Sequence, residues 1–149
     1  MSFDTKNGRN GKEQITMNTG IKPVKELVAE ANKVVITLSI DETRALQDTG
    51  DGIILDIRDV RELWRDGTIP GAIHMPRGML EFWADPKSPY HKDVFSSDKT
   101  LILYCASAWR SALATKALQD MGMSNVAHMD GGFSAWKERD LPIETVEKK

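Results

Sequence analysis

The chain has 149 residues and a formal net charge of −2, and 40% of its residues are hydrophobic and 28% charged. This length suits one domain with a substantial core, and the charge, without any basic block, argues against nucleic acid as the principal partner. No apolar run approaches the roughly 18 residues of a membrane-spanning helix, so no membrane partner is expected.

The amino-terminal part predicts a tail followed by a helix, a strand and a second helix. Residues 1–20 are rich in Asn, Gly, Lys and Thr and predict a flexible polar tail without the apolar segment of a signal peptide. Residues 21–33 are expected to form a helical extension that begins near Pro23. A β-branched run at 34–38 predicts a strand, and residues 39–42 have the form of a capping box that starts a short helix.

The middle of the chain repeats the alternation of strand and helix. Residues 53–56 predict a buried strand, and residues 59–62 again have a capping form that starts a helix. Residues 72–75 predict a short strand. A helix is expected over about 78–83, with Phe82 packing inward.

The last part predicts two further strands, 101–104 and 126–129, each followed by a helix. These helices are expected over about 111–118 and 133–139, and residues 144–149 are expected to be a charged tail. Because strands alternate with helices, the fold class is α/β. We expect an open, mostly parallel central sheet of about five strands with helices on both faces.

The only cysteine, Cys105, lies between a predicted strand and a predicted helix. Open α/β sheets bind ligands at this place, and the free N–H groups and dipole of the helix stabilise an anion such as a thiolate. Arg110 is a neighbouring cation. Lone cysteines are more often small buried hydrophobes, but those lie inside an element rather than in such a loop. Cys105 is therefore the predicted nucleophile, and its lone thiol indicates a reducing compartment, with the cytoplasm as the expected location.

Four stretches in this order and spacing resemble the single-domain rhodanese (thiosulfate sulfurtransferase) homology family. They are Leu55-Asp56-Ile57-Arg58 with Glu62; Gly67 to His74; Tyr104 to Ser111; and Gly131 to Trp136 with Leu141-Pro142. The resemblance covers about residues 34–143, which are expected to form one rhodanese-like domain. It implies a sulfurtransferase that forms a persulfide on Cys105.

The same resemblance implies the partners and the site. The donor would be a small molecule such as thiosulfate, and the acceptor a thiol, cyanide or a protein; no cofactor is implied. The substrate-binding candidates are the loop residues Ala106, Ser107, Ala108, Trp109 and Arg110. The family commonly has glycine at position 108, which permits a positive φ. Alanine there costs on the order of 1 kcal/mol, which affects the expected catalytic rate more than the fold.

Two other functions remain open. One is a non-catalytic sulfur-carrier or regulatory module with this fold. The other is a cysteine-based phosphatase or arsenate reductase, whose loops place five residues between Cys and Arg to hold a tetrahedral oxyanion. Here only four residues separate Cys105 from Arg110, and the smaller loop favours a sulfur atom over a phosphate.

Several other polar residues follow predicted strands. His74 and His128 are expected to be structural or exposed, because transfer from a thiolate needs no general base. Asp56 is expected in a structural pair, whereas Arg58 either joins that pair or borders the pocket. Arg77 is a further candidate for the mouth of the pocket. No cluster has the spacing of metal ligands, so neither a metal nor a cofactor is expected.

Overall fold

The computed structural model describes residues 20–149, so the predicted tail at 1–20 lies outside the described residues except for Gly20. The strands are β1 (Ile36–Leu38), β2 (Gly52–Asp56), β3 (Ile73–His74), β4 (Thr100–Tyr104) and β5 (Val126–Met129). The α-helices are α2 (Val24–Val34), α3 (Ile40–Thr49), α4 (Val60–Asp66), α5 (Leu80–Ala84), α6 (Trp109–Asp120) and α7 (Gly132–Glu138). Two short 3₁₀ helices are η2 (Arg77–Met79) and η3 (Asp93–Ser96).

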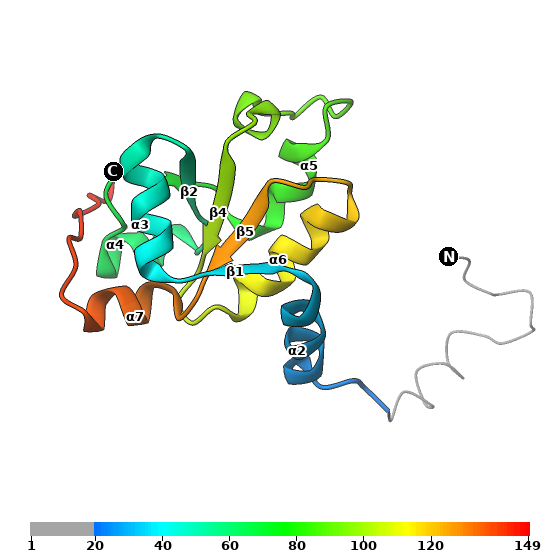
Figure 1. The fold of residues 1–149 in the computed structure, drawn as a ribbon. Coiled ribbons are helices and arrows are strands. Elements are labelled where there is room, and N and C mark those ends of the chain that lie inside the picture. The colour runs from blue at the N-terminus through cyan, green and yellow to red at the C-terminus, as the bar shows by residue number, and fades with distance from the viewer. Residues whose placement is uncertain (1–19) are drawn as a thin grey trace, which may run out of the picture.

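The strands form one five-stranded sheet in the order β1-β5-β4-β2-β3, and every pair is parallel. This confirms the predicted α/β class and the open sheet of five strands (Figure 1). The parallel arrangement follows from the crossover connections between consecutive strands, which contain helices.

Helices cover both faces of the sheet because successive strand residues point to opposite sides. Leu101 and Leu103 of β4 pack with residues of α5 and α6. Ile102 and Tyr104 pack on the other face with residues of α3 and α7. Outside this sandwich, α2 packs against α6 (Figure 1). The carboxyl end of β4 therefore lies in the middle of the sheet, with helices on either side of it.

The predicted capping boxes are confirmed at the starts of α3 and α4. Ser39 accepts from the Glu42 N–H while the Glu42 carboxylate accepts from the Ser39 N–H. Asp59 and Glu62 make the corresponding pair at α4. These reciprocal bonds satisfy N–H groups that a helix start otherwise leaves without partners.

Two predictions are wrong, one about the first residue of the first strand and one about the orientation of Phe82. The strand predicted from residue 34 begins at Ile36, because Val34 completes the last turn of α2 and the next N–H, of Val35, bonds to the Ala31 carbonyl at 3.0 Å. Phe82 is 54% exposed rather than packed inward. Since η2 precedes α5, the helix begins at Leu80, and the buried residues of this helix are Leu80 and Ala84, one turn apart.

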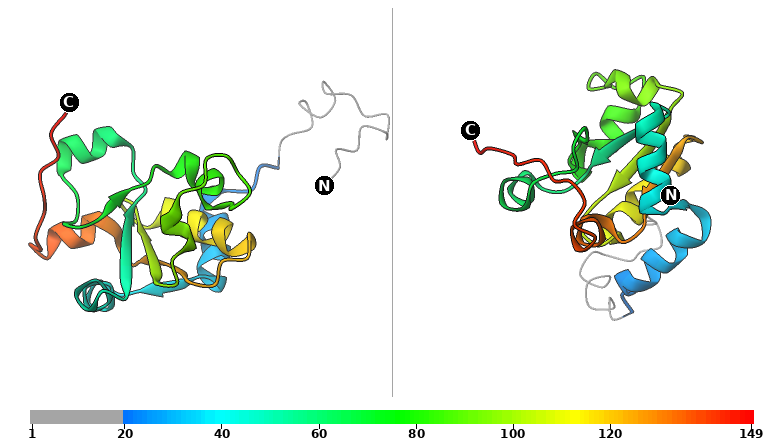
Figure 2. Two further views of the ribbon diagram at one scale, coloured as in Figure 1. Left: turned by 90° about the horizontal axis from the view of Figure 1, so that it is seen from above. Right: turned by 60° about the vertical axis from the view of Figure 1, so that its left-hand side comes forward.

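The carboxyl-terminal segment runs from α7 past α4 (Figure 2). It is held there by an isolated antiparallel bridge, in which Thr68 and Glu144 exchange backbone hydrogen bonds of 2.9 and 2.8 Å. In the part of the chain that the structure describes, no helix is long and apolar enough to cross a membrane.

Candidate active site

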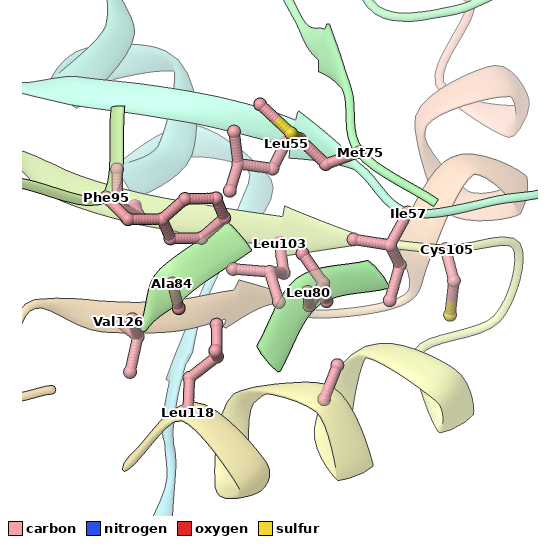
Figure 3. Packing of buried hydrophobic residues seen from close by; sticks show 12 residues of the cluster. Leu55, Ile57, Met75, Leu80, Ala84, Phe95, Leu103, Cys105, Leu118 and Val126 are labelled. Carbon is pink, nitrogen blue, oxygen red and sulfur yellow. The ribbon is translucent and has the colours of Figure 1, made fainter. Parts of the chain in front are cut away.

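Cys105 follows β4 and points from the end of the sheet toward the start of α6 (Figure 3). The residue is 1% exposed. The sulfur accepts a hydrogen bond from the Ser111 N–H at 3.4 Å, and the thiol donates to the Ser111 hydroxyl at 3.6 Å. The predicted nucleophile therefore lies beneath its own loop, against the first turn of α6.

The start of α7 holds the cysteine loop from the other side. The carbonyls of Cys105 and Ala106 accept from the N–H groups of Phe133 and Ser134 at 2.8 and 3.0 Å. A Cβ on Gly132 would lie within 2.6–2.8 Å of the same carbonyl groups. Only glycine permits this close approach, so the Gly-Gly stretch fixes the position of the loop.

This anchoring leaves the N–H groups of the loop available. In a trans peptide the N–H points away from its carbonyl, so the N–H groups that follow the anchored carbonyls point away from α7. Within residues 20–149, the N–H groups of residues 106–110 donate to no carbonyl or side chain. They resemble the free donors at any helix start, which form a concave site for an anion.

Ala108 has the backbone conformation that the family's glycine permits. Its φ is 73° and its ψ is 5°, in the left-handed region, and it forms the N-cap of α6. An L-residue in this region carries a steric cost of about 1 kcal/mol. The loop therefore keeps the shape of a glycine-containing loop and stores strain at one residue.

Arg110 extends from the first turn of α6 to α4. Its guanidinium donates to both carboxylate oxygens of Glu62 at 2.7 and 3.0 Å, and its side chain is 42% exposed. The bond from Arg110 lowers the pKa of Glu62, and the same pair raises the pKa of Arg110 with a smaller contribution from Cys105. A fixed positive charge thus lies beside the cysteine loop. Glu62 belongs to a stretch that resembles the family but was not among the predicted site residues.

Arg58 and Asp56 form a buried pair behind the site. The guanidinium donates to the two carboxylate oxygens at 2.9 and 2.7 Å and to the Gly67 carbonyl at 2.7 Å. Thr68 and Tyr104 also donate to Asp56. Although burial alone would raise the pKa of Asp56, the bonds from Arg58 and Tyr104 lower it. Of the two roles left open for Arg58, the structure contains the pairing, with a side chain that is 1% exposed.

The other predicted residues lie at different distances from the loop. Ser107 and Trp109 are exposed on it. Arg77 forms an ion pair with Glu81 one turn along at 2.8 Å, and within residues 20–149 no side-chain hydrogen bond or ion pair joins it to the cysteine loop. The His74 ring bonds to the Arg58 carbonyl at 2.7 Å, which is a structural contact.

His128, which was expected to be structural or exposed, is linked to the predicted nucleophile through Ser111. It lies on β5 and is buried, and its Nδ1 is 2.9 Å from the Ser111 hydroxyl that contacts Cys105. Its Nε2 is 3.1 Å from the Thr37 hydroxyl and 3.2 Å from the Asn32 side-chain oxygen. Among the described residues no group of three His, Cys, Asp or Glu side chains forms a metal-binding arrangement.

Together these features define an open α/β domain with a cysteine in a loop whose N–H groups have no acceptor among residues 20–149. A family model for the rhodanese-like domain matches residues 39–139, and the chain belongs to this family. A sulfurtransferase of Allochromatium vinosum is 30% identical over 105 residues, covering 70% of this chain and 90% of that protein. The human thiosulfate:glutathione sulfurtransferase is 27% identical over 110 residues, and the match covers 70% of this chain and 95% of the human protein.

A solved structure gives a different indication of activity. It is a Rhodopseudomonas palustris protein of unknown function, described as a possible tyrosine phosphatase. It is 50% identical, with a TM-score of 0.80, and the match covers 85% of this chain and 98% of that one. The family model confirms the predicted resemblance to the rhodanese family. The names of the similar proteins differ on the reaction, since two are sulfurtransferases and one is a possible tyrosine phosphatase.

Proposed function

We propose that this protein is a sulfurtransferase that carries sulfane sulfur as a persulfide on Cys105. The thiolate attacks the outer sulfur of thiosulfate, a new S–S bond forms, the S–S bond of the donor breaks, and sulfite leaves with the bonding electrons. A thiophilic acceptor such as cyanide or a thiol then attacks the outer sulfur. For cyanide, thiocyanate forms and the thiolate is regenerated.

The observation that supports this reaction is the geometry of the loop from Cys105 to Arg110. Both the thiolate and the persulfide are anions, and the available N–H groups of residues 106–110 provide donors for them. Arg110, held by Glu62, provides the positive charge for the oxyanion end of thiosulfate. The half-exposed guanidinium keeps N–H groups that can bind a donor while its pair with Glu62 persists.

The loop size favours sulfur over phosphate. Only four residues separate Cys105 from Arg110, and the helix begins at Trp109, so the free loop is short. A tetrahedral phosphate needs a wider ring of donors than a single sulfur atom does. We therefore propose sulfur transfer even though a structural relative is described as a possible tyrosine phosphatase.

The proposed partners follow from the same chemistry. Two relatives are named as sulfurtransferases, one of them for thiosulfate and glutathione. We propose a small sulfur donor such as thiosulfate and a thiol, cyanide or protein acceptor. A reducing compartment such as the cytoplasm suits a thiol that must return to its free form.

The test is turnover of thiosulfate and cyanide, measured as thiocyanate formed. Wild-type protein is expected to turn over, and Cys105→Ser to be inactive with an unchanged circular dichroism spectrum. A wild-type protein that forms persulfide but does not turn over would support the carrier alternative. Hydrolysis of an aryl phosphate that depends on Cys105, without sulfur transfer, would refute the proposal.

A further inference from the structure

A chain of hydrogen bonds joins the Cys105 thiol to Asn32 on α2 and Thr37 on β1. The thiol contacts the Ser111 hydroxyl at 3.6 Å, and that hydroxyl contacts His128 Nδ1 at 2.9 Å. His128 Nε2 continues to Thr37 and Asn32, both of which are exposed. The chain therefore begins at a buried sulfur and ends at the surface formed by β1 and α2.

The direction of the bonds follows from the tautomer of His128. We assign the hydrogen to Nε2, where the Asn32 side-chain oxygen can accept it. The other ring nitrogen of a neutral imidazole has none, and it accepts from the Ser111 hydroxyl. The Ser111 oxygen is then free to accept from the thiol. The thiol and the Ser111 hydroxyl thus both donate toward His128, and the ring donates onward to Asn32.

Because Cys105 is buried, the direction of these hydrogen bonds determines where the thiol proton can go. A thiol reacts as a thiolate, so its proton must leave before sulfur transfer. The residue is 1% exposed, and the hydrogen-bond partners of its side chain among residues 20–149 are the N–H and the hydroxyl of Ser111. The N–H can only donate, so within the described residues the hydroxyl is the acceptor for the departing proton.

We propose that His128 is the proton acceptor of Cys105 and acts through Ser111, an inference that rests on the proposed function. The S–H bond breaks as an O–H bond forms on Ser111, and the original Ser111 O–H bond breaks as an N–H bond forms on His128. The products are a thiolate and an imidazolium, and the total charge is unchanged. The Ser111 hydroxyl then donates to the thiolate.

The surroundings of His128 suit this role. Asn32 on α2, Thr37 on β1 and Ser111 on α6 are uncharged, and the neighbouring residue of β4 is Leu103. Asp130, which follows β5, supplies the negative charge that acts on the ring. Burial lowers the pKa of His128, which favours the neutral ring at rest, and the charge of Asp130 opposes this effect and favours the imidazolium that the transfer forms. The exposed Thr37 hydroxyl links the ring to solvent.

The test measures thiolate formation without any sulfur donor. The rate at which iodoacetamide alkylates Cys105 is recorded against pH for wild type, His128→Asn, Ser111→Ala and the double variant. Asparagine at 128 can still accept from Ser111 but cannot take a proton. His91→Asn is the matched control, because His91 contacts Ser96 and is not part of the chain.

We expect His128→Asn to raise the pH midpoint of alkylation by about one unit and to slow alkylation at pH 7 about tenfold. This is the effect expected when the thiolate loses the positive charge of an imidazolium two hydrogen bonds away. Ser111→Ala should do the same, and the double variant should match the singles, since both remove one path. The control should match wild type.

Thermal melts by circular dichroism identify the variants that fold. If His128→Asn does not fold, Ser111→Ala alone tests the relay. An unchanged midpoint in a folded variant, or additive shifts in the double variant, would overturn the relay. Alkylation needs no thiosulfate, so these outcomes are independent of whether Cys105 transfers sulfur. Persulfide formation together with unchanged midpoints would retain the proposed function and reject the relay alone.

Discussion

Replacing Ala108 with glycine isolates the one strained residue of the loop. Ala108 has a φ of 73°, which costs an L-residue about 1 kcal/mol and costs glycine almost nothing. Glycine also gives the unfolded chain more freedom, which destabilises the fold by about 0.4–1 kcal/mol. These effects oppose each other, so Ala108→Gly should shift the melting temperature by less than about 3 °C.

The rate should respond more than the stability. If relief of the strain favours the reactive loop by the full amount of about 1 kcal/mol, thiosulfate turnover rises by at most about fivefold. The assay is the initial rate of thiocyanate formation from thiosulfate and cyanide, paired with a thermal melt.

Ala106→Gly is the matched control, because Ala106 lies in the same loop and its φ is not positive. This variant gains the same freedom in the unfolded state without any relief of strain. It should therefore melt lower than Ala108→Gly and turn over no faster than wild type. Equal melting temperatures for the two variants, with no gain in rate at position 108, would refute the strain argument.

Three further predictions concern the surroundings of the loop. Arg110→Ala should lower kcat/KM for thiosulfate at least about tenfold, the effect of one lost charge-assisted hydrogen bond, with little change in the thermal melt; unchanged kinetics would show that the guanidinium does not bind the donor. Asp56→Asn should destabilise the fold by about 3 kcal/mol in urea, because it leaves the Arg58 charge buried and uncompensated. The folded-state pKa of Asp56 is lowered, so the contribution of its carboxylate to the free energy of unfolding is complete above a pH of about 4 and is lost as the pH falls through that lowered pKa. Wild type should therefore lose more stability than Asp56→Asn on acidification. Parallel curves of stability against pH for the two proteins would contradict this. Wild type should not hydrolyse an aryl phosphate appreciably, and a glycine inserted between Ala108 and Trp109 should further reduce sulfur transfer; a faster insertion variant would contradict the argument from loop size.

The fold was largely predictable because its signals are local. Short apolar runs between turn residues predicted the strands, and the capping boxes at Ser39 and Asp59 located two helix starts. The errors arose where tertiary packing or a preceding turn determines where a helix begins or ends. Val34 extends α2, which packs on α6, and Phe82 faces outward because η2 sets where α5 begins.

The candidate site was predictable only where its residues are close in sequence. The loop from Cys105 to Arg110 is one continuous stretch, and its position after a strand indicated its role. Glu62 lies 48 residues from Arg110, and the two meet because β2 and β4 are neighbours. Opposite charges after adjacent strands are a signal for such a pair once the strand order is known. His128 reaches Ser111 because β5 pairs with β4 beneath α6, which composition and spacing do not reveal.

The central claim is that Cys105 carries transferable sulfur. The most direct measurement is the intact mass of the protein after incubation with thiosulfate, before and after a reductant, for wild type and Cys105→Ser. Wild type should gain the mass of one sulfur atom and lose it on reduction, and the variant should gain none. The same reducible gain on Cys105→Ser, or no gain on wild type, would contradict the assignment of Cys105 as the sulfur carrier.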